Sequence, residues 1–142
     1  MMGFATVSAA EAANRIGENG DATYVDVRTV AEFAAGRPRG RAVNLPVVFH
    51  HPQGGEPHPN EAFALVAAHA LDHATPLVVG GATDPRADHA AALLAEAGFG
   101  DVVVLGGGID AWQAAGLPLT GDNRPGVSYV SLLTAARRAK SA

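Results

Sequence analysis

The sequence contains no cysteine, which excludes disulfide bonds, thiolate metal sites and a thiol nucleophile. It also lacks an uninterrupted apolar run of about 18 residues, so we expect no membrane-spanning helix. No long run of like charges occurs and the formal net charge is −4, which argues against nucleic acid or an acidic membrane surface as a partner. The first residues have no basic stretch followed by an apolar one, so we expect no secretory signal and a cytoplasmic protein.

Apolar residues nevertheless make up 48% of the chain and charged residues 17%, a balance that supports a folded core. Aromatic residues are scarce, at 6%, so this core is expected to consist mainly of aliphatic side chains. The length of 142 residues suits one domain.

Strand-like and helix-like segments alternate along the chain. Capping boxes at Ser8–Glu11 and Thr29–Glu32 predict two helix starts. Asp84 followed by Pro85 predicts a third, with Asp84 as the N-cap residue. Because two of the strands are apolar throughout, the pattern indicates a parallel sheet covered by helices on both faces. The predicted strands are residues 23–27, 42–45, 76–80 and 102–105.

The end of the chain is predicted to differ from the rest. Residues 122–126 have the composition of a linker, and Tyr129, Leu132, Leu133 and Ala136 have helical spacing. We therefore expect a domain over residues 1–121, followed by a linker and a C-terminal helical tail over 122–142.

Four segments follow one another in a characteristic order. They are residues 24–28 with Glu32-Phe33, residues 40–46, residues 77–80 with the loop and helix after them, and residues 104–118, which include Gly107 and Trp112. Together they resemble a single-domain rhodanese-like (thiosulfate sulfurtransferase-like) protein over roughly residues 6–119. The resemblance implies an α/β fold, a three-layer sandwich around a five-stranded parallel sheet. It gives Asp26, Arg28 and Gly107 structural roles, and Trp112 is expected to anchor the core.

The resemblance also implies an active loop after a central strand, with the pattern Cys-x-x-Gly-x-Arg-Ser. In the family, the cysteine carries a sulfane sulfur as a persulfide, and backbone N–H groups at the start of the next helix hold the anion. Here Gly81 occupies the cysteine position, Asp84 the glycine position, and Arg86 keeps the arginine. We therefore predict no catalytic residue and no sulfur transfer. The degenerate loop consists of Gly81, Ala82, Thr83, Asp84, Pro85 and Arg86.

Asp84 carries a further hypothesis. Its carboxylate is expected to bind the free N–H groups at the start of the helix, so that the anion cradle is occupied by the chain itself. The alternative interpretation is a simple helix cap.

Two functions from different classes fit these residues. A scaffold without its nucleophile favours a binding or regulatory module, with an unknown protein or a small anionic ligand as partner. Contact residues for that partner are predicted in the loop, at Arg86, and in the basic patch of Arg37, Arg39 and Arg41. The alternative is a sulfurtransferase-like or phosphatase-like enzyme with non-cysteine chemistry, for which Thr83 supplies the only hydroxyl of the loop.

The histidines are interpreted as solvated rather than as metal ligands. His50, His51 and His58 lie in a Pro- and Gly-rich loop without rigid spacing. His69 and His73 have helical spacing but lie beside the predicted buried face, with no evident third ligand. We therefore expect no metal and no cofactor.

Overall fold

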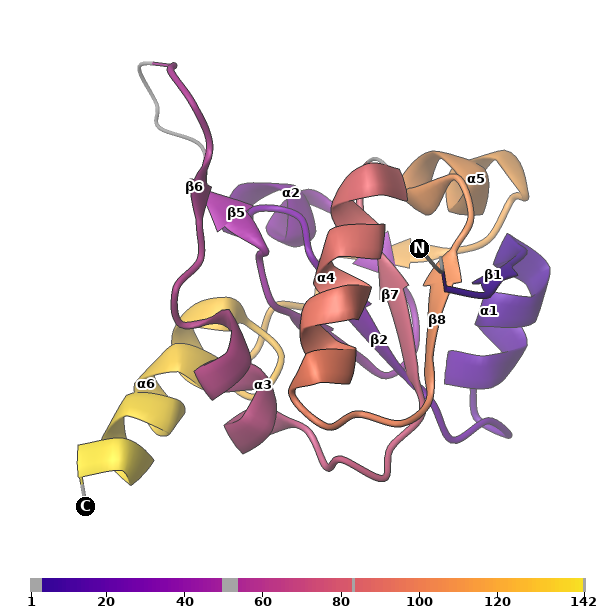
Figure 1. Ribbon diagram of the computed structural model, residues 1–142. Coiled ribbons are helices and arrows are strands. Elements are labelled where there is room, and N and C mark those ends of the chain that lie inside the picture. Colours follow the sequence, from indigo (N-terminus) through magenta and orange to yellow (C-terminus); the bar gives the residue numbers. More distant parts are fainter. Residues whose placement is uncertain (1–3, 50–53, 83, 142) are drawn as a thin grey trace.

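The computed structural model describes residues 4–49, 54–82 and 84–141 (Figure 1). Its centre is a five-stranded sheet in the order β1-β8-β7-β2-β4, in which every pair of neighbouring strands is parallel. The predicted α/β fold with a five-stranded parallel sheet is thereby confirmed. The strands are β1 (Thr6–Val7), β2 (Thr23–Asp26), β4 (Ala42–Asn44), β7 (Leu77–Gly80) and β8 (Val102–Leu105).

Helices cover both faces of the sheet and complete three layers (Figure 1). One core lies between the sheet and helices α3, α4 and α6, and the other lies between the sheet and helices α1 and α5. Successive residues of β7 alternate between the two cores, Leu77 and Val79 on the first and Val78 on the second. The helices are α1 (Ala9–Ile16), α2 (Val30–Ala35), α3 (Phe63–Ala70), α4 (Asp84–Glu96), α5 (Gly108–Ala114) and α6 (Tyr129–Ser141).

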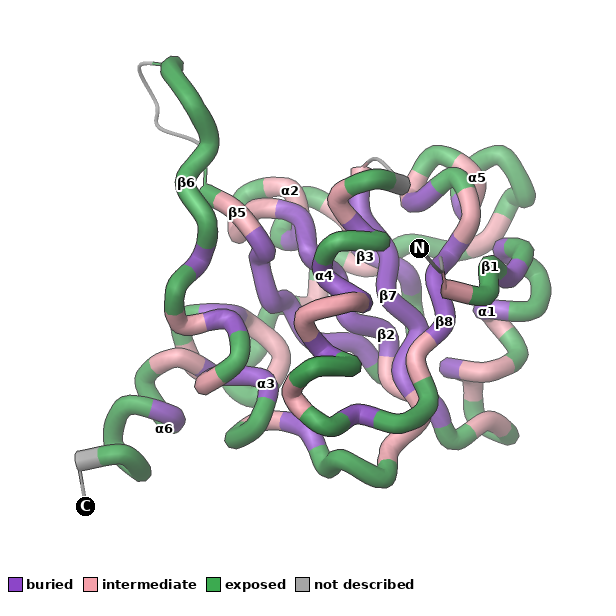
Figure 2. Tube along the Cα trace, in the orientation of Figure 1, coloured by how far each residue is buried: buried purple, intermediate pink, exposed green. Residues whose placement is uncertain are grey.

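In the middle of the sheet, β7 is buried along its whole length and β2 is buried from Tyr24 to Asp26 (Figure 2). Tyr24, Val25 and Val78 have no exposed surface. This explains why the sequence shows continuous apolar strands rather than an alternating pattern.

The two predicted capping boxes differ in outcome. At α2 the box is complete, because the Thr29 hydroxyl accepts from the backbone N–H of Glu32 and the Glu32 carboxylate accepts from that of Thr29. At α1 only the Ser8 half forms, since Glu11 directs its carboxylate to Arg15 at 2.7 Å. An i,i+4 ion pair on the exposed face of α1 replaces the return hydrogen bond.

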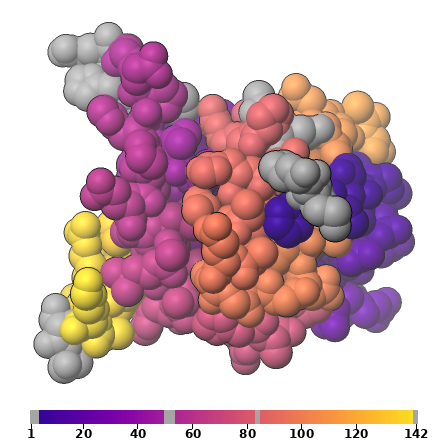
Figure 3. All heavy atoms as spheres, viewed as in Figure 1, coloured from indigo at the N-terminus to yellow at the C-terminus, as the bar shows by residue number. Residues whose placement is uncertain are grey.

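Two short antiparallel ribbons were not predicted. One pairs β3 (Arg37–Pro38) with β9 (Leu119–Thr120), and the other pairs β5 (Val48–Phe49) with β6 (His58–Pro59). The chain around β6 projects from the body of the molecule (Figure 3). These strands have two residues each, too few to give a periodic pattern.

The C-terminal helix is part of the main core. Tyr129, Leu132 and Ala136 of α6 are buried in the same cluster as α3 and α4. Before α6, the carbonyl of Val127 accepts from the backbone N–H of Asn44 at 2.9 Å, so this segment contacts the outer edge of β4. The domain boundary after residue 121 stays a prediction. In the described part of the chain, no helix has the length and apolarity needed to cross a membrane.

Candidate functional site

Gly81 lies directly after β7, the central strand of the sheet, at its carboxyl end. This is the edge where parallel α/β folds collect ligands. Gly81 is buried, and its carbonyl accepts from the backbone N–H of Ile109 at 3.2 Å. On the other side, the carbonyl of Gly80 accepts from Val27 at 3.0 Å, so the start of the loop is fixed between β2 and α5.

Gly108 allows this close approach between the loop and α5. Its φ of +59° is a left-handed conformation that favours glycine, and a Cβ atom there would overlap the carbonyl oxygen of Gly81. The preceding Gly107, one of the predicted structural residues, is the N-cap residue of α5 with a φ of +76°. Gly107 and Gly108 therefore allow the start of α5 to pack directly against the degenerate loop.

The rest of the loop is described only in part. Helix α4 begins at Asp84, one residue before the predicted first helical residue, Pro85. Thr83 and the side chain of Asp84 lie outside the described residues, so both the self-occupied cradle and a hydroxyl nucleophile stay predictions. Ala82 and Arg86 are half-buried.

Asp26 and Arg28 form a buried ion pair beside the loop, at the end of β2. The Arg28 guanidinium donates to Asp26 Oδ1 at 2.9 Å and to Oδ2 at 2.7 Å, and also to the carbonyl of Gly36 at 2.8 Å. The amide of Asn44 donates to the carbonyls of both residues, each at 3.1 Å. These contacts tie β2 to β4 and α2, and this placement favours the structural role predicted for the pair.

Burial shifts the pKa values of two groups in this cluster. Burial raises the pKa of Asp26, and the hydrogen bonds and charge of Arg28 oppose that rise. Burial also raises the pKa of the neighbouring Tyr24 phenol well above its usual value, and the charge of Asp26 adds to the effect. Tyr24 is thus a neutral phenol at physiological pH, and within the described structure its hydroxyl has no hydrogen-bond partner.

Glu32 is the second acidic residue near the loop. Burial tends to raise its pKa, but hydrogen bonds from Thr29 and the charges of Arg28 and Arg86 outweigh that effect and lower the pKa. Arg86 of the loop and Glu32 of α2 are therefore close enough to interact across the site. A hollow of about 250 Å³ borders this region, lined by Arg28, Glu32, Ala35, Gly36, Ile109, Gln113 and Leu119.

Trp112 is the buried residue through which α5 packs on the core. Only 1% of its surface is exposed, and its indole N–H donates to the carbonyl of Pro118 at 2.9 Å. Its placement fits the predicted core role and supports the loop indirectly, through the position of α5.

The predicted basic patch is divided by the structure. Arg37 is buried and donates to the carbonyls of Pro38 and Gly40, each at 2.9 Å. Arg41 donates to the carbonyls of Gly20 and Ala22. Of these three arginines, Arg39 alone has a guanidinium that forms no hydrogen bond with other residues that the structure describes. Sequence reasoning missed two residues beside this patch, Asp122 and Arg124.

The histidines that the structure describes differ in their surroundings. His58 and His69 are exposed, and His73 stacks on Phe99 with ring centroids 4.5 Å apart. His50 and His51 lie outside the described residues. Within residues 4–49, 54–82 and 84–141, no three His, Asp or Glu side chains are gathered as a metal site would require.

Comparison with known proteins identifies the relatives of this chain. The family model for the rhodanese-like domain matches residues 8–115. The chain is 34% identical over 98 residues to rhodanese-like domain-containing protein 17 of Arabidopsis thaliana, a match that covers 68% of this chain and 62% of that relative's length. It is 33% identical over 97 residues to thiosulfate sulfurtransferase 18 of the same plant, covering 68% of this chain and 70% of the relative.

Solved structures give the same result. The crystal structure of the Alr3790 protein from Anabaena sp. superimposes with a TM-score of 0.67 at 28% identity, covering 81% of this chain and 91% of that one. The polysulfide-sulfur transferase homodimer from Wolinella succinogenes superimposes with a TM-score of 0.62 at 28% identity, covering 82% and 78% of the two chains.

Proposed function

We propose that this chain, which belongs to the rhodanese-like domain family, is a binding or regulatory module that does not perform sulfur transfer. The observation that carries this proposal is the position of Gly81. It follows the central strand at the carboxyl edge of the sheet, where the family pattern has its cysteine, and the sequence holds no other cysteine to replace it.

Sulfur transfer needs a group that can attack a sulfane sulfur and then be attacked in turn. A thiolate meets both needs because it is strongly nucleophilic and leaves readily. Glycine offers no side chain, and the nearby Tyr24 phenol and Asp26 carboxylate are both fully buried. The retained features, namely the buried pair of Asp26 and Arg28 and the contact between Gly81 and Ile109, support the shape of the loop without supplying a nucleophile.

The test is cyanide-dependent formation of thiocyanate from thiosulfate. We expect no turnover by the wild-type protein and none by Gly81→Cys alone, because the carboxylate of Asp84 is proposed to compete for the anion cradle. The double variant Gly81→Cys, Asp84→Gly is expected to gain activity. Ala95→Cys, which puts a thiol on an exposed position of α4, is the matched control and should stay inactive.

Each result has a distinct meaning. Turnover by the wild-type protein comparable to that of the double variant would overturn the proposal and favour non-cysteine chemistry at the loop. Loss of that turnover on Thr83→Ala would then identify the hydroxyl responsible.

A further inference from the structure

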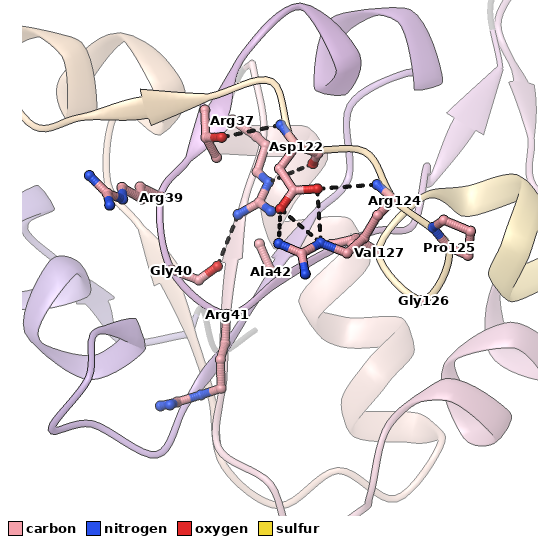
Figure 4. A pocket seen from close by; sticks show the side chains of 11 residues that line it. Arg37, Arg39, Gly40, Arg41, Ala42, Asp122, Arg124, Pro125, Gly126 and Val127 are labelled. Carbon is pink, nitrogen blue, oxygen red and sulfur yellow. Dashed lines mark hydrogen bonds and ion pairs between the residues drawn. The ribbon is translucent and has the colours of Figure 1, made fainter.

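A second hollow lies away from the loop, beside the outer edge of the sheet. It has a volume of about 630 Å³ and is formed by residues 37–42 and 120–127, two segments far apart in the sequence (Figure 4). That volume falls in the range of roughly 300–1,000 Å³ that small-molecule sites occupy. The charged residues that line it are one acidic residue, Asp122, and four basic residues, Arg37, Arg39, Arg41 and Arg124.

This pocket concentrates positive charge on a negatively charged chain. Four arginines against one aspartate give it a formal charge of +3, whereas the whole chain carries −4. Burial lowers the pKa of Arg37; Asp122 opposes that effect, and the nearby charge of Arg124 adds to it. The pocket therefore holds repelling guanidinium groups that its own carboxylate balances only in part.

Two of the arginines are fixed as part of the wall. Arg37 donates to the carbonyls of Pro38, Gly40 and Asp122, and Arg41 points out of the centre of the pocket toward other carbonyls (Figure 4). These contacts hold the two charges in place without neutralising them, because a carbonyl carries no net charge.

The other two arginines can reach a ligand. Arg124 pairs with Asp122, but its side chain is 73% exposed. Arg39 is exposed, and its side chain forms no hydrogen bond or ion pair with the residues that the structure describes. In Figure 4 its guanidinium extends away from Asp122, so it would turn inward by rotation of an exposed side chain.

We propose that this pocket binds a small molecule carrying two or more oxyanion groups, phosphate or carboxylate. The planar guanidinium of arginine matches both groups with paired hydrogen bonds. We expect more than one anionic group because a single carboxylate balances only one of the three excess positive charges of the lining. A second oxyanion reaches Arg39 and balances a further charge.

This inference is independent of the proposed loss of sulfur transfer. No residue of the 81–86 loop lines the pocket, and no lining residue enters the thiocyanate assay. Failure of one proposal therefore leaves the other standing.

The test is calorimetric titration of the full chain with pyrophosphate and, separately, with citrate, at low ionic strength because salt screens such contacts. Arg39→Ala and Arg124→Ala should each weaken binding by about tenfold, the loss of one charge-assisted pair. Arg138→Ala is the matched control, since it removes the same charge from an exposed position on α6 and should leave affinity unchanged. Thermal unfolding of every variant verifies that it is folded.

Asp122→Asn should change the affinity in the opposite direction from the arginine variants. Removing the competing carboxylate should tighten binding by at least about threefold, a result that a merely structural role for Asp122 does not produce. Saturable binding of pyrophosphate alone would identify a phosphate ligand, and binding of citrate alone would identify a polycarboxylate. The proposal is overturned if neither anion binds, if Arg138→Ala weakens binding as much as Arg39→Ala, or if Asp122→Asn fails to tighten it.

Discussion

Replacing Tyr24 with phenylalanine should stabilise the protein, whereas the same replacement at Tyr129 should destabilise it. Both phenols are buried, with 0% and 4% of their surface exposed. They differ in hydrogen bonding. The Tyr129 hydroxyl donates to Asn60 Oδ1 at 3.2 Å and accepts from Asn60 Nδ2 at 3.0 Å, whereas the Tyr24 hydroxyl has no partner in the described structure.

The magnitude follows from what each hydroxyl loses on folding. A buried donor without a partner costs about 1–3 kcal/mol, so Tyr24→Phe should recover roughly 1 kcal/mol after the small void is counted. Tyr129→Phe removes its contacts with Asn60, whose amide keeps its bonds to Pro46 and Ala62, so we expect a loss of about 1 kcal/mol. The two variants should therefore differ by about 2 kcal/mol in free energy of unfolding.

Urea unfolding provides the assay, followed by the fluorescence of Trp112, the single and nearly buried tryptophan. Each kcal/mol should also move the melting temperature by roughly 2–4 °C in a domain of this size. The reasoning would be refuted if Tyr24→Phe destabilised the protein by about 1 kcal/mol or more, the contribution of one hydrogen bond. Such a loss would mean that the Tyr24 hydroxyl has a hydrogen-bond partner in solution.

Two further predictions concern the loop and its neighbour α2. Gly108→Ala should cost about 3 kcal/mol, from left-handed strain of about 1–2 kcal/mol plus the clash with the carbonyl of Gly81. Gly116→Ala is the control, because φ at Gly116 is +73° and no atom lies within 4 Å of the added Cβ, so this variant has backbone strain without a clash. Equal urea midpoints for the two variants would contradict the predicted clash at Gly108. Glu32→Gln should lower the free energy of unfolding at pH 7 by less than about 1 kcal/mol, because solvent screens this partly exposed side chain. The pKa of Glu32 is lowered in the folded state, so the contribution of its charge is present above the usual value of 4.5. That difference should vanish as the pH falls through the lowered pKa, and a constant difference between pH 7 and pH 3 would argue against the role of the charge.

Most of the fold was predictable because its signals are local. The apolar strands β7 and β8, and the capping box at Thr29 and Glu32, each depend on residues close together in the sequence. The ribbons β3–β9 and β5–β6 left no such signal, because two-residue strands have no periodicity. The half-formed box at Ser8 shows the same limit, since Arg15 competes for Glu11 from the next turn.

The site was predictable as far as the loop pattern extends. The position of Gly81 follows from the order of segments around it, whereas its contact with Ile109 depends on how α5 returns to the sheet. The arginine pocket could not be foreseen, because Arg37 and Asp122 are 85 residues apart in the sequence. The sequence also places Arg37 and Arg41 in one patch with Arg39 and cannot reveal that backbone carbonyls hold the first two.

The hydrogen bond from Asn44 to Val127 has a practical meaning for anyone who shortens this chain. An outer strand with free N–H groups is a template on which another molecule can add a strand of its own. The segment around Val127 takes up one N–H group of this edge, that of Asn44, so we expect it to hinder the addition of a further strand. Cutting the chain after residue 121 would expose that N–H group, and we expect the shortened protein to associate with itself more readily.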